Sequence, residues 1–331
     1  MLISTRSIRP IFAIALLVVL TAAMPVRAEE YPNRPVHIIV PYPPGDPGDV
    51  LARAYADFAS KSLGQKFVVE NRPGAMGIIG TNTVAKSPAD GYTLVVTTFA
   101  HSTNPSVNSK MPYDTRKDFT AISMLGRSPG AVFVVSGISQ VHTLAEFVKL
   151  AKDNPGKVTF ANAGIGQMSG LAGELFMKLA DVKMISVPYA GASSYATDIM
   201  TDRVNSGVMG LIGSVQHVKA GTLRALALTG PKRTPILPDV PTFRELGFTD
   251  MNLIGWFGIL GPAGIPRDRV ELLYREAAKA TKSAEFKQLL ERYGIDAVGS
   301  SPDEFAKFID ENLDSTAAMV KRIGYVPPSS Q

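Results

Sequence analysis

Short runs of β-branched and other apolar residues alternate with helical stretches along the chain. The run Val36–Val40 predicts a buried strand, and Leu51, Tyr55 and Phe58 are spaced as on one face of a following helix. The same alternation predicts strands at residues 66–70, 94–98, 132–135, 158–161, 183–188, 223–228 and 256–260, with helices at 80–86, 143–152, 169–180 and 193–201. Strands that alternate with helices favour parallel sheets covered on both faces. We therefore expect an α/β fold.

Two further helices are predicted to close the chain, and both carry helix-start signals. Pro266 lies just before the first, whose apolar face includes Val270 and Leu273. The second follows Ser301-Pro302-Asp303-Glu304, in which a serine precedes a proline and a glutamate lies three positions after the serine. This spacing is typical of a capping box at a helix start.

The amino-terminal segment has the composition of a secretory signal peptide. Arg6 and Arg9 precede an uncharged run at residues 11–23, and Val26-Arg27-Ala28 offers the small residues that a signal peptidase needs. A membrane-spanning helix needs about 20 apolar residues, which argues against the alternative of an uncleaved anchor. A lipid anchor would need a cysteine, and the chain has none. We expect cleavage after Ala28 and a mature periplasmic protein that starts at Glu29.

Charge and composition narrow the class of function. Removing the segment with Arg6, Arg9 and Arg27 lowers the formal charge from +5 to +2. The rest of the sequence has no lysine or arginine cluster of the kind that tracks phosphates, so we expect no nucleic acid partner. Because cysteine is absent, stability must come from burial without disulfides. About 300 mature residues suffice for two hydrophobic cores, which favours two domains.

The loops at the carboxyl ends of the predicted strands are the candidate binding segments, because ligands of open parallel sheets bind there. The first strand leads into a loop rich in proline and glycine, Tyr42-Pro43-Pro44-Gly45-Asp46. Prolines fix φ, and glycines let backbone N–H groups approach a ligand at the positive end of the following helix. The alternative is a plain strand-to-helix turn in which an aspartate caps the helix.

Two more loops lead into helices in the same way. The second, at residues 162–170, contains Gly164, Gly166 and Ser169, close to the glycine pattern of dinucleotide sites. The next strand ends without the acidic residue that would hold a ribose, so we predict no dinucleotide and no other cofactor. The third loop, at residues 188–193, supplies the ring of Tyr189 beside another helix start. Aromatic faces and helix N-termini suit a small anion with an apolar part.

Signals of catalysis are poor. The sequence has no Gly-x-Ser-x-Gly elbow, no P-loop, no His-Glu-x-x-His motif and no cysteine nucleophile. Of the four histidines, only His101 follows a predicted strand end closely enough for ligand contact. Asp198 and Asp202 share a helix face, but like charges at this spacing are more typical of a solvated surface than of a metal site. We expect neither catalytic residues nor a metal.

Short motifs follow one another in a fixed order along the chain. They include Tyr31-Pro32-Asn33-Arg34-Pro35, Val40-Pro41-Tyr42-Pro43-Pro44-Gly45, Glu70-Asn71-Arg72-Pro73-Gly74, Asp90-Gly91-Tyr92, Leu171-Ala172-Gly173-Glu174, Lys219-Ala220-Gly221-Thr222, Leu237-Pro238-Asp239-Val240-Pro241 and Gly261-Pro262-Ala263-Gly264. Each motif alone is weak. Jointly, from Tyr31 to about Gly324, they resemble the extracytoplasmic solute receptors of tripartite tricarboxylate transporters, the Bug-type family.

This resemblance implies a type II periplasmic-binding-protein fold, with a ligand cleft between two α/β domains. It implies a first domain at residues 29–130 and 252–331 and a second at 131–251, after a signal peptide at 1–28. It also implies a small organic carboxylate as ligand and a membrane permease as partner, and we expect a monomer. With the loops above, it gives these candidate ligand contacts: Tyr42, Pro43, Pro44, Gly45, Asp46, Thr97, Thr98, His101, Ala163, Gly164, Gly166, Gln167, Tyr189, Gly191 and Asn205.

The chain departs from the family where the ligand is expected. The usual second glycine of the first loop is Asp46, and the usual serine or threonine after the Gly-x-Gly of the second domain is Gln167. A frequent acidic residue in the second domain appears as Asn205. These changes make a highly anionic ligand such as citrate less attractive. Asp46 either caps the helix or pairs with an amine, amide or hydroxyl of the ligand.

The leading hypothesis is therefore a periplasmic receptor that closes over a small organic acid and delivers it to a membrane permease. A receptor that presents the same ligand to a sensor kinase is an alternative that predicts the same fold. A secreted α/β hydrolase is disfavoured, because the sequence has no nucleophile elbow.

Overall fold

The computed structural model describes residues 30–327, so the predicted signal peptide and its cleavage site after Ala28 lie outside the described residues. The chain divides at Asn33 into two units. All helices and strands described below belong to the unit that begins at Arg34.

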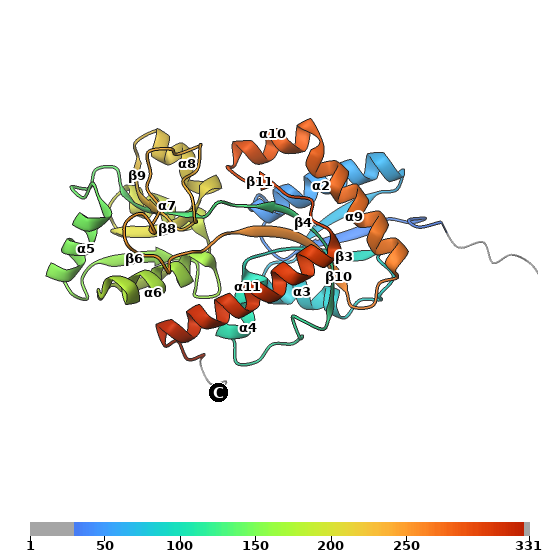
Figure 1. The fold of residues 1–331 in the computed structure, drawn as a ribbon, viewed down its shortest axis with the longest axis horizontal. Helices are drawn as coiled ribbons and strands as arrows, with labels where there is room; N and C mark the ends of the chain where they lie inside the picture. The colour runs from blue at the N-terminus through green and yellow to red at the C-terminus, as the bar shows by residue number, and fades with distance from the viewer. Residues whose placement is uncertain (1–29, 328–331) are drawn as a thin grey trace, which may run out of the picture. The chain divides into compact units, whose positions relative to one another are not determined.

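A six-stranded mixed sheet is formed by segments from both ends of this unit (Figure 1). Its strands are β1 (Val36–Val40), β2 (Phe67–Asn71), β3 (Thr93–Thr98), β4 (Phe119–Arg127), β10 (Trp256–Pro262) and β11 (Asp296–Ala297), in the spatial order β11-β4-β10-β3-β1-β2. The helices of these segments are α2 (Pro47–Leu63), the 3₁₀ turn η1 (Ala75–Gly77), α3 (Ile78–Ala85), α4 (Ala100–Val107), α9 (Arg267–Lys282), α10 (Ala284–Arg292) and α11 (Pro302–Ile323).

The middle of the chain forms a five-stranded mixed sheet. Its strands are β5 (Ala131–Ser136), β6 (Thr159–Asn162), β7 (Ile185–Pro188), β8 (Ser206–Gly210) and β9 (Leu223–Leu228), in the order β7-β6-β8-β5-β9. Its helices are α5 (Leu144–Asp153), α6 (Met168–Ala180), α7 (Ala192–Met200) and α8 (Leu211–Lys219). We call the six-stranded sheet with its helices lobe 1 and the five-stranded sheet with its helices lobe 2. The predicted domain boundaries at residues 130 and 252 fall in the segments that connect the sheets, and they stay a prediction.

The α/β class is confirmed, but the expectation of parallel sheets is wrong in part. β10 runs antiparallel to β3 and β4, and β5 runs antiparallel to β8 and β9. The chain passes from the six-stranded to the five-stranded sheet at β5 and returns to the six-stranded sheet at β10. A crossover helix makes two successive strands parallel only when it connects strands of one sheet. The alternation of strands and helices therefore does not predict the direction of a strand that follows a strand of the other sheet.

Several elements of the described chain were not predicted from the sequence, among them β4, α4, β8, α8 and α10. The clearest case is α4, at residues for which no helix was predicted. It carries the buried polar run His101, Ser102, Thr103 and Asn104 and has Pro105 inside it. Because the buried face of this helix carries polar residues, its sequence shows no apolar stripe.

The predicted helix starts are confirmed at the carboxyl end of the chain. Pro266 is the N-cap residue of α9, and Ser301 with Glu304 forms the capping box of α11. Among the helices of residues 30–327, none is long and apolar enough to span a bilayer.

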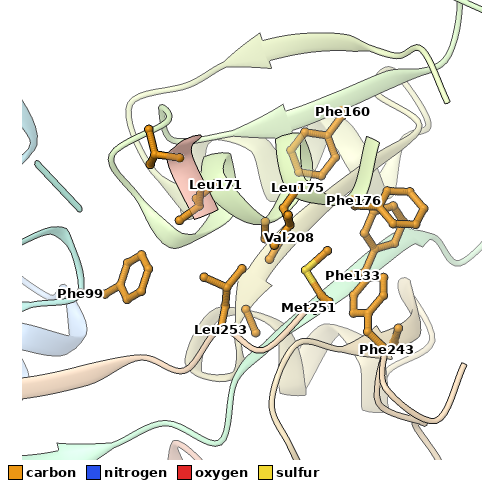
Figure 2. Close-up of a cluster of buried hydrophobic side chains, with 14 of the residues drawn as sticks. Phe99, Phe133, Phe160, Leu171, Leu175, Phe176, Val208, Phe243, Met251 and Leu253 are labelled. Atoms are coloured by element: carbon orange, nitrogen blue, oxygen red, sulfur yellow. The ribbon is translucent and has the colours of Figure 1, made fainter. Parts of the chain in front are cut away.

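A cluster of aromatic side chains forms the centre of lobe 2 (Figure 2). Phe133 of β5 has its ring centroid 5.0 Å from those of Phe147 and Phe176, and Phe243 lies 5.6 Å from Phe176. Burial of each such ring contributes about 1.5–3 kcal/mol. The cluster continues to Phe99 at the end of β3, so one apolar core supports the loops of both sheets.

Candidate functional site

The loop after β1 brings three predicted residues together. Tyr42 is buried, and its hydroxyl accepts a hydrogen bond from Thr98 Oγ1 at 2.9 Å and lies 3.5 Å from Thr97 Oγ1. Burial raises the pKa of the Tyr42 hydroxyl, which keeps it neutral. The loop is therefore fixed to the carboxyl end of β3 by a neutral hydroxyl cluster.

Asp46 is the N-cap residue of α2. Its backbone is extended, and its Oδ1 accepts a hydrogen bond from Gly48 N at 2.9 Å. The capping arrangement considered from the sequence is therefore present. Burial raises the pKa of Asp46 to about 6, against the effect of the Gly48 N–H, and the nearby charge of Asp49 raises it further.

Asp49 organises the backbone of this loop, a role that the sequence did not reveal. It is 3% exposed and accepts hydrogen bonds from Gly45 N at 2.9 Å, Arg53 Nε at 3.0 Å and Asn71 Nδ2 at 2.9 Å. Gly45 has φ +82°, a conformation in which glycine avoids the strain of a side chain. Although burial alone raises the pKa of Asp49, the hydrogen bonds from Arg53, Gly45 and Asn71 hold it below its usual value, so this carboxylate is ionised at neutral pH.

A strained segment beside the first loop was also missed. Ala75 and Met76 have positive φ values of 47° and 54°, which non-glycine residues rarely adopt. The carbonyl oxygen of Met76 accepts a hydrogen bond from Asn104 Nδ2 at 3.1 Å, and a side chain at Gly77 would meet the Tyr42 ring at 3.3 Å. Close packing against α4 and Tyr42 thus holds the segment in this conformation.

The loop after β6 leads into α6 without a side-chain cap. Gly164, at φ +95°, donates its N–H to Asn162 Oδ1 at 2.8 Å, and Ala163 N donates to Ser169 Oγ at 3.0 Å. Gln167 is the N-cap residue, but its side chain makes no cap hydrogen bond. The first backbone N–H groups of α6 therefore have no capping side-chain acceptor.

The loop after β7 fixes an aromatic ring beside another uncapped helix. The Tyr189 hydroxyl donates to Asp198 Oδ2 at 2.8 Å, and its ring packs edge-on against Tyr195 at a centroid distance of 5.7 Å. Gly191 is the N-cap residue of α7 and provides no side-chain acceptor. The Tyr189 hydroxyl is already used, which leaves its ring face for an apolar contact.

The second loop packs directly on residues of lobe 1. A Cβ added at Gly166 would lie 2.6 Å from Met76 Sδ and 3.0 Å from Asn104 Oδ1. Asn104 is 2% exposed, and its Oδ1 has no hydrogen-bond partner within the described part of the chain. The glycine therefore permits a close approach between the lobes at the edge where the three loops lie.

Two further predicted site residues differ in where they lie, one inside α4 and one at the far end of the lobe-2 sheet. His101 is 2% exposed inside α4, with its ring centroid 5.0 Å from that of Phe119 and 6.4 Å from that of Trp256. Burial lowers its pKa to about 3, so the ring is neutral. Asn205 lies just before β8, where its Oδ1 accepts from Thr159 N at 3.0 Å. The position of Asn205 is at the amino ends of β6 and β8, opposite the loops, so we correct its grouping with the loops. Ligand contact by the buried His101 stays a prediction.

The comparisons with known proteins point to one family. The model of the tripartite tricarboxylate transporter family receptors matches residues 51–325. Protein BugT of Bordetella pertussis is 34% identical over 304 residues, which cover 91% of this chain and 93% of that protein. The structure of the periplasmic binding protein BugD aligns with a TM-score of 0.83 at 28% identity and covers 90% of this chain and 100% of that chain. R. palustris Rpa4515 with adipate aligns with a TM-score of 0.84 at 31% identity, with the same coverage. The predicted family and its periplasmic-binding-protein fold are confirmed.

Proposed function

The chain belongs to the tripartite tricarboxylate transporter receptor family, and we propose that it captures a small organic carboxylate outside the cytoplasm and delivers it to a membrane permease. A structural neighbour at 31% identity holds adipate, a small organic carboxylate. The observation that carries the proposal is that α6 and α7, like α8, start without a side-chain cap at the carboxyl edge of lobe 2.

The ligand carboxylate binds at the start of α6, with α7 beside it. The first N–H groups of a helix point toward such a ligand, and the helix dipole favours negative charge there. Gln167 adds a partly buried amide that can donate to a carboxylate oxygen. The ring of Tyr189 covers an apolar part of the ligand.

Closure of the two lobes over the ligand takes place in the segments that connect the sheets. Ser128 N donates to Gly255 O at 2.9 Å, and Ala131 N donates to Thr229 Oγ1 at 2.8 Å, so the outgoing and returning segments bond each other. A ligand that contacts both lobes stabilises the closed population by its differential affinity.

The receptor acts as a monomer in the periplasm after cleavage behind Ala28. The intact mass of protein recovered from the periplasm tests this step. A chain that starts at Glu29 is expected, and recovered protein that still contains Arg27 contradicts the proposed site.

A binding experiment tests the carboxylate assignment. Gently purified protein is denatured and its ligand identified by mass spectrometry, and calorimetry then measures the affinity for that compound and for adipate. Gln167→Asp places a negative charge at the start of α6 and is expected to weaken binding at least about tenfold, since charge-assisted hydrogen bonds contribute about 1.5–3 kcal/mol.

Gln216→Asp makes the same change on the exposed face of α8 and serves as the matched control. The proposal is contradicted if Gln167→Asp leaves the affinity unchanged. It is also contradicted if no organic acid binds in a screen. Uptake of the identified ligand by cells that lack either this protein or the permease separates transport from a purely sensory role.

A further inference from the structure

The lobe-1 side of the site presents acceptors that lack donors. Asp46 uses Oδ1 for its own helix, and no hydrogen bond to its Oδ2 is formed within residues 30–327. Asn104 Oδ1 is buried and equally without a partner in the described chain. A buried acceptor left without a donor costs about 1–3 kcal/mol, which makes Asn104 Oδ1 a candidate ligand contact. Asp46 is partly exposed, so its Oδ2 is open to a donor from a ligand.

No cation among residues 30–327 pairs with Asp46. Arg53 lies closest in sequence on α2, but its Nε and Nη2 bond Asp49, and Nη2 also bonds Asn71. Across the described residues, Asp46 has no ion pair. Its neighbours are the negative charge of Asp49 and the neutral hydroxyl of Tyr42, which leaves the Asp46 carboxylate without a counter-charge.

A contact path links Asp46 to the start of α6. A Cβ at Gly48 would lie 3.4 Å from both Asp46 Oδ1 and the Tyr42 ring, and the Tyr42 ring faces Gly77. Met76 next to Gly77 touches Gly166, and Asn104 Oδ1 points at the same glycine. Asn104 is more than nine-tenths buried, so its unpartnered oxygen is a second, independent sign of a missing donor at this edge.

We propose that the ligand carries a hydrogen-bond-donating or cationic group at the end opposite its carboxylate, and that Asp46 accepts this group. This inference rests on the proposed function, since it assumes a carboxylate at the start of α6. A second carboxylate at the other end would face an ionised Asp46 and be repelled. An ammonium would instead form a charge-assisted hydrogen bond there.

Matched pairs of probes test the inference by calorimetry at pH 8. Adipate is compared with 6-aminohexanoate, and succinate with 4-aminobutyrate, because each pair differs only in a terminal carboxylate or ammonium at similar length. The amino acid of the better-fitting pair is expected to bind at least about tenfold more tightly than its dicarboxylate. Asp46→Asn is expected to abolish or reverse that preference.

Asparagine is as good an N-cap as aspartate, so Asp46→Asn keeps the start of α2 while it removes the charge. Asp303→Asn removes an exposed charge from the first turn of α11 and is expected to leave the preference unchanged. A dicarboxylate that binds as tightly as the amino acid, or a preference that Asp46→Asn does not change, overturns the inference and leaves the proposed function intact. A protein that binds no organic acid in any probe set overturns the proposed function itself.

Discussion

The loops after β1 and β6 have the same design, a strand, a glycine-bearing turn and a helix, but they differ in charge. In the first, the protein's own carboxylates occupy the helix start: Asp46 caps α2, and Asp49 accepts from Gly45 N. In the second, Gln167 leaves the start of α6 without a side-chain cap. One side of the site is thus rich in acceptors and the other rich in donors.

The comparison teaches that the N-cap residue decides what a strand-to-helix loop can bind. A carboxylate at the N-cap position satisfies the helix N–H groups and excludes a second anion. An N-cap residue without a cap bond leaves those N–H groups for a ligand. Two substitutions in each loop test this difference.

Asp49→Ala is expected to have the largest effect, because it removes the acceptor for Gly45 N, Arg53 and Asn71 together. Loss of a buried, hydrogen-bonded carboxylate leaves those donors unpaired and should lower the free energy of unfolding by about 2–4 kcal/mol. Urea denaturation at pH 7 measures it. Asp57→Ala is the matched control, since Asp57 also pairs at i,i+4 on α2 with Lys61 but is exposed. A similar loss of unfolding free energy in both variants would show that Asp49 does not organise this loop.

Gly166→Ala tests the close approach of the second loop to lobe 1. The added methyl group would overlap Met76 Sδ at 2.6 Å and crowd Asn104 Oδ1 at 3.0 Å. Overpacking of this kind costs about 1–3 kcal/mol, and because it acts between the lobes we expect it to weaken ligand binding about tenfold or more. Calorimetry with the native ligand provides the measurement.

Gly213→Ala is the control for Gly166→Ala, because Gly213 is exposed within α8 and an added Cβ there would meet only Met209 Cε, at 3.7 Å. Met76→Ala combined with Gly166→Ala should restore part of the affinity. A double variant no better than Gly166→Ala would show that the loss does not come from this contact.

The sequence predicted the fold best where an apolar period and the family motifs agreed. Val36–Val40 is observed as β1 with unchanged bounds, and the capping box at Ser301 starts α11 as expected. It failed where burial involves polar residues, as in α4, or where direction depends on the partner sheet, as for β10. Such features depend on tertiary contacts that a local pattern does not record.

The candidate site was predicted in part for the same reason. Glycine and proline in the loops marked the positions of Tyr42 and Gly166, because turn chemistry is local. Asn104 and Met76 were missed because their roles come from tertiary contacts. They bond each other across 28 positions of sequence, and both pack against Gly166 of the other lobe. The polar run around Asn104 directly after β3 was the one available signal. Whether these residues bind ligand stays a proposal.

Asp46→Asn tests the charge of the first loop through the pH dependence of stability. The folded-state pKa of Asp46, about 6, lies above its ordinary value of 3.8, so folding takes up a proton between these pH values. The carboxyl group therefore favours the folded state below about pH 4, and this contribution is lost as the pH rises through about 6. Asparagine cannot ionise. One pKa unit corresponds to about 1.4 kcal/mol, so the variant should gain about 2 kcal/mol relative to the wild type between pH 4 and pH 8.

Melting temperatures of both proteins at pH 4.5 and pH 8, without ligand, measure this gain. Glu304 of the α11 capping box provides the contrast, because hydrogen bonds from Ser301 lower the pKa of its carboxyl group. Glu304→Gln should therefore lose stability relative to the wild type over the same interval. An Asp46→Asn variant that is less stable at pH 8 than at pH 4.5, relative to the wild type, would mean that the helix dipole outweighs desolvation at this cap.

Gln167→Ser is expected to have the smallest effect and is the most direct test of the comparison. The Gln167 backbone is extended, at φ −94° and ψ 155°, so a serine there can cap α6 as Asp46 caps α2. Adding a cap should raise the free energy of unfolding by about 0.5–1 kcal/mol. The serine hydroxyl would then occupy an N–H group that we assign to the ligand, so carboxylate affinity should fall by a similar amount. A gain in stability without any loss of affinity would place the ligand away from the start of α6.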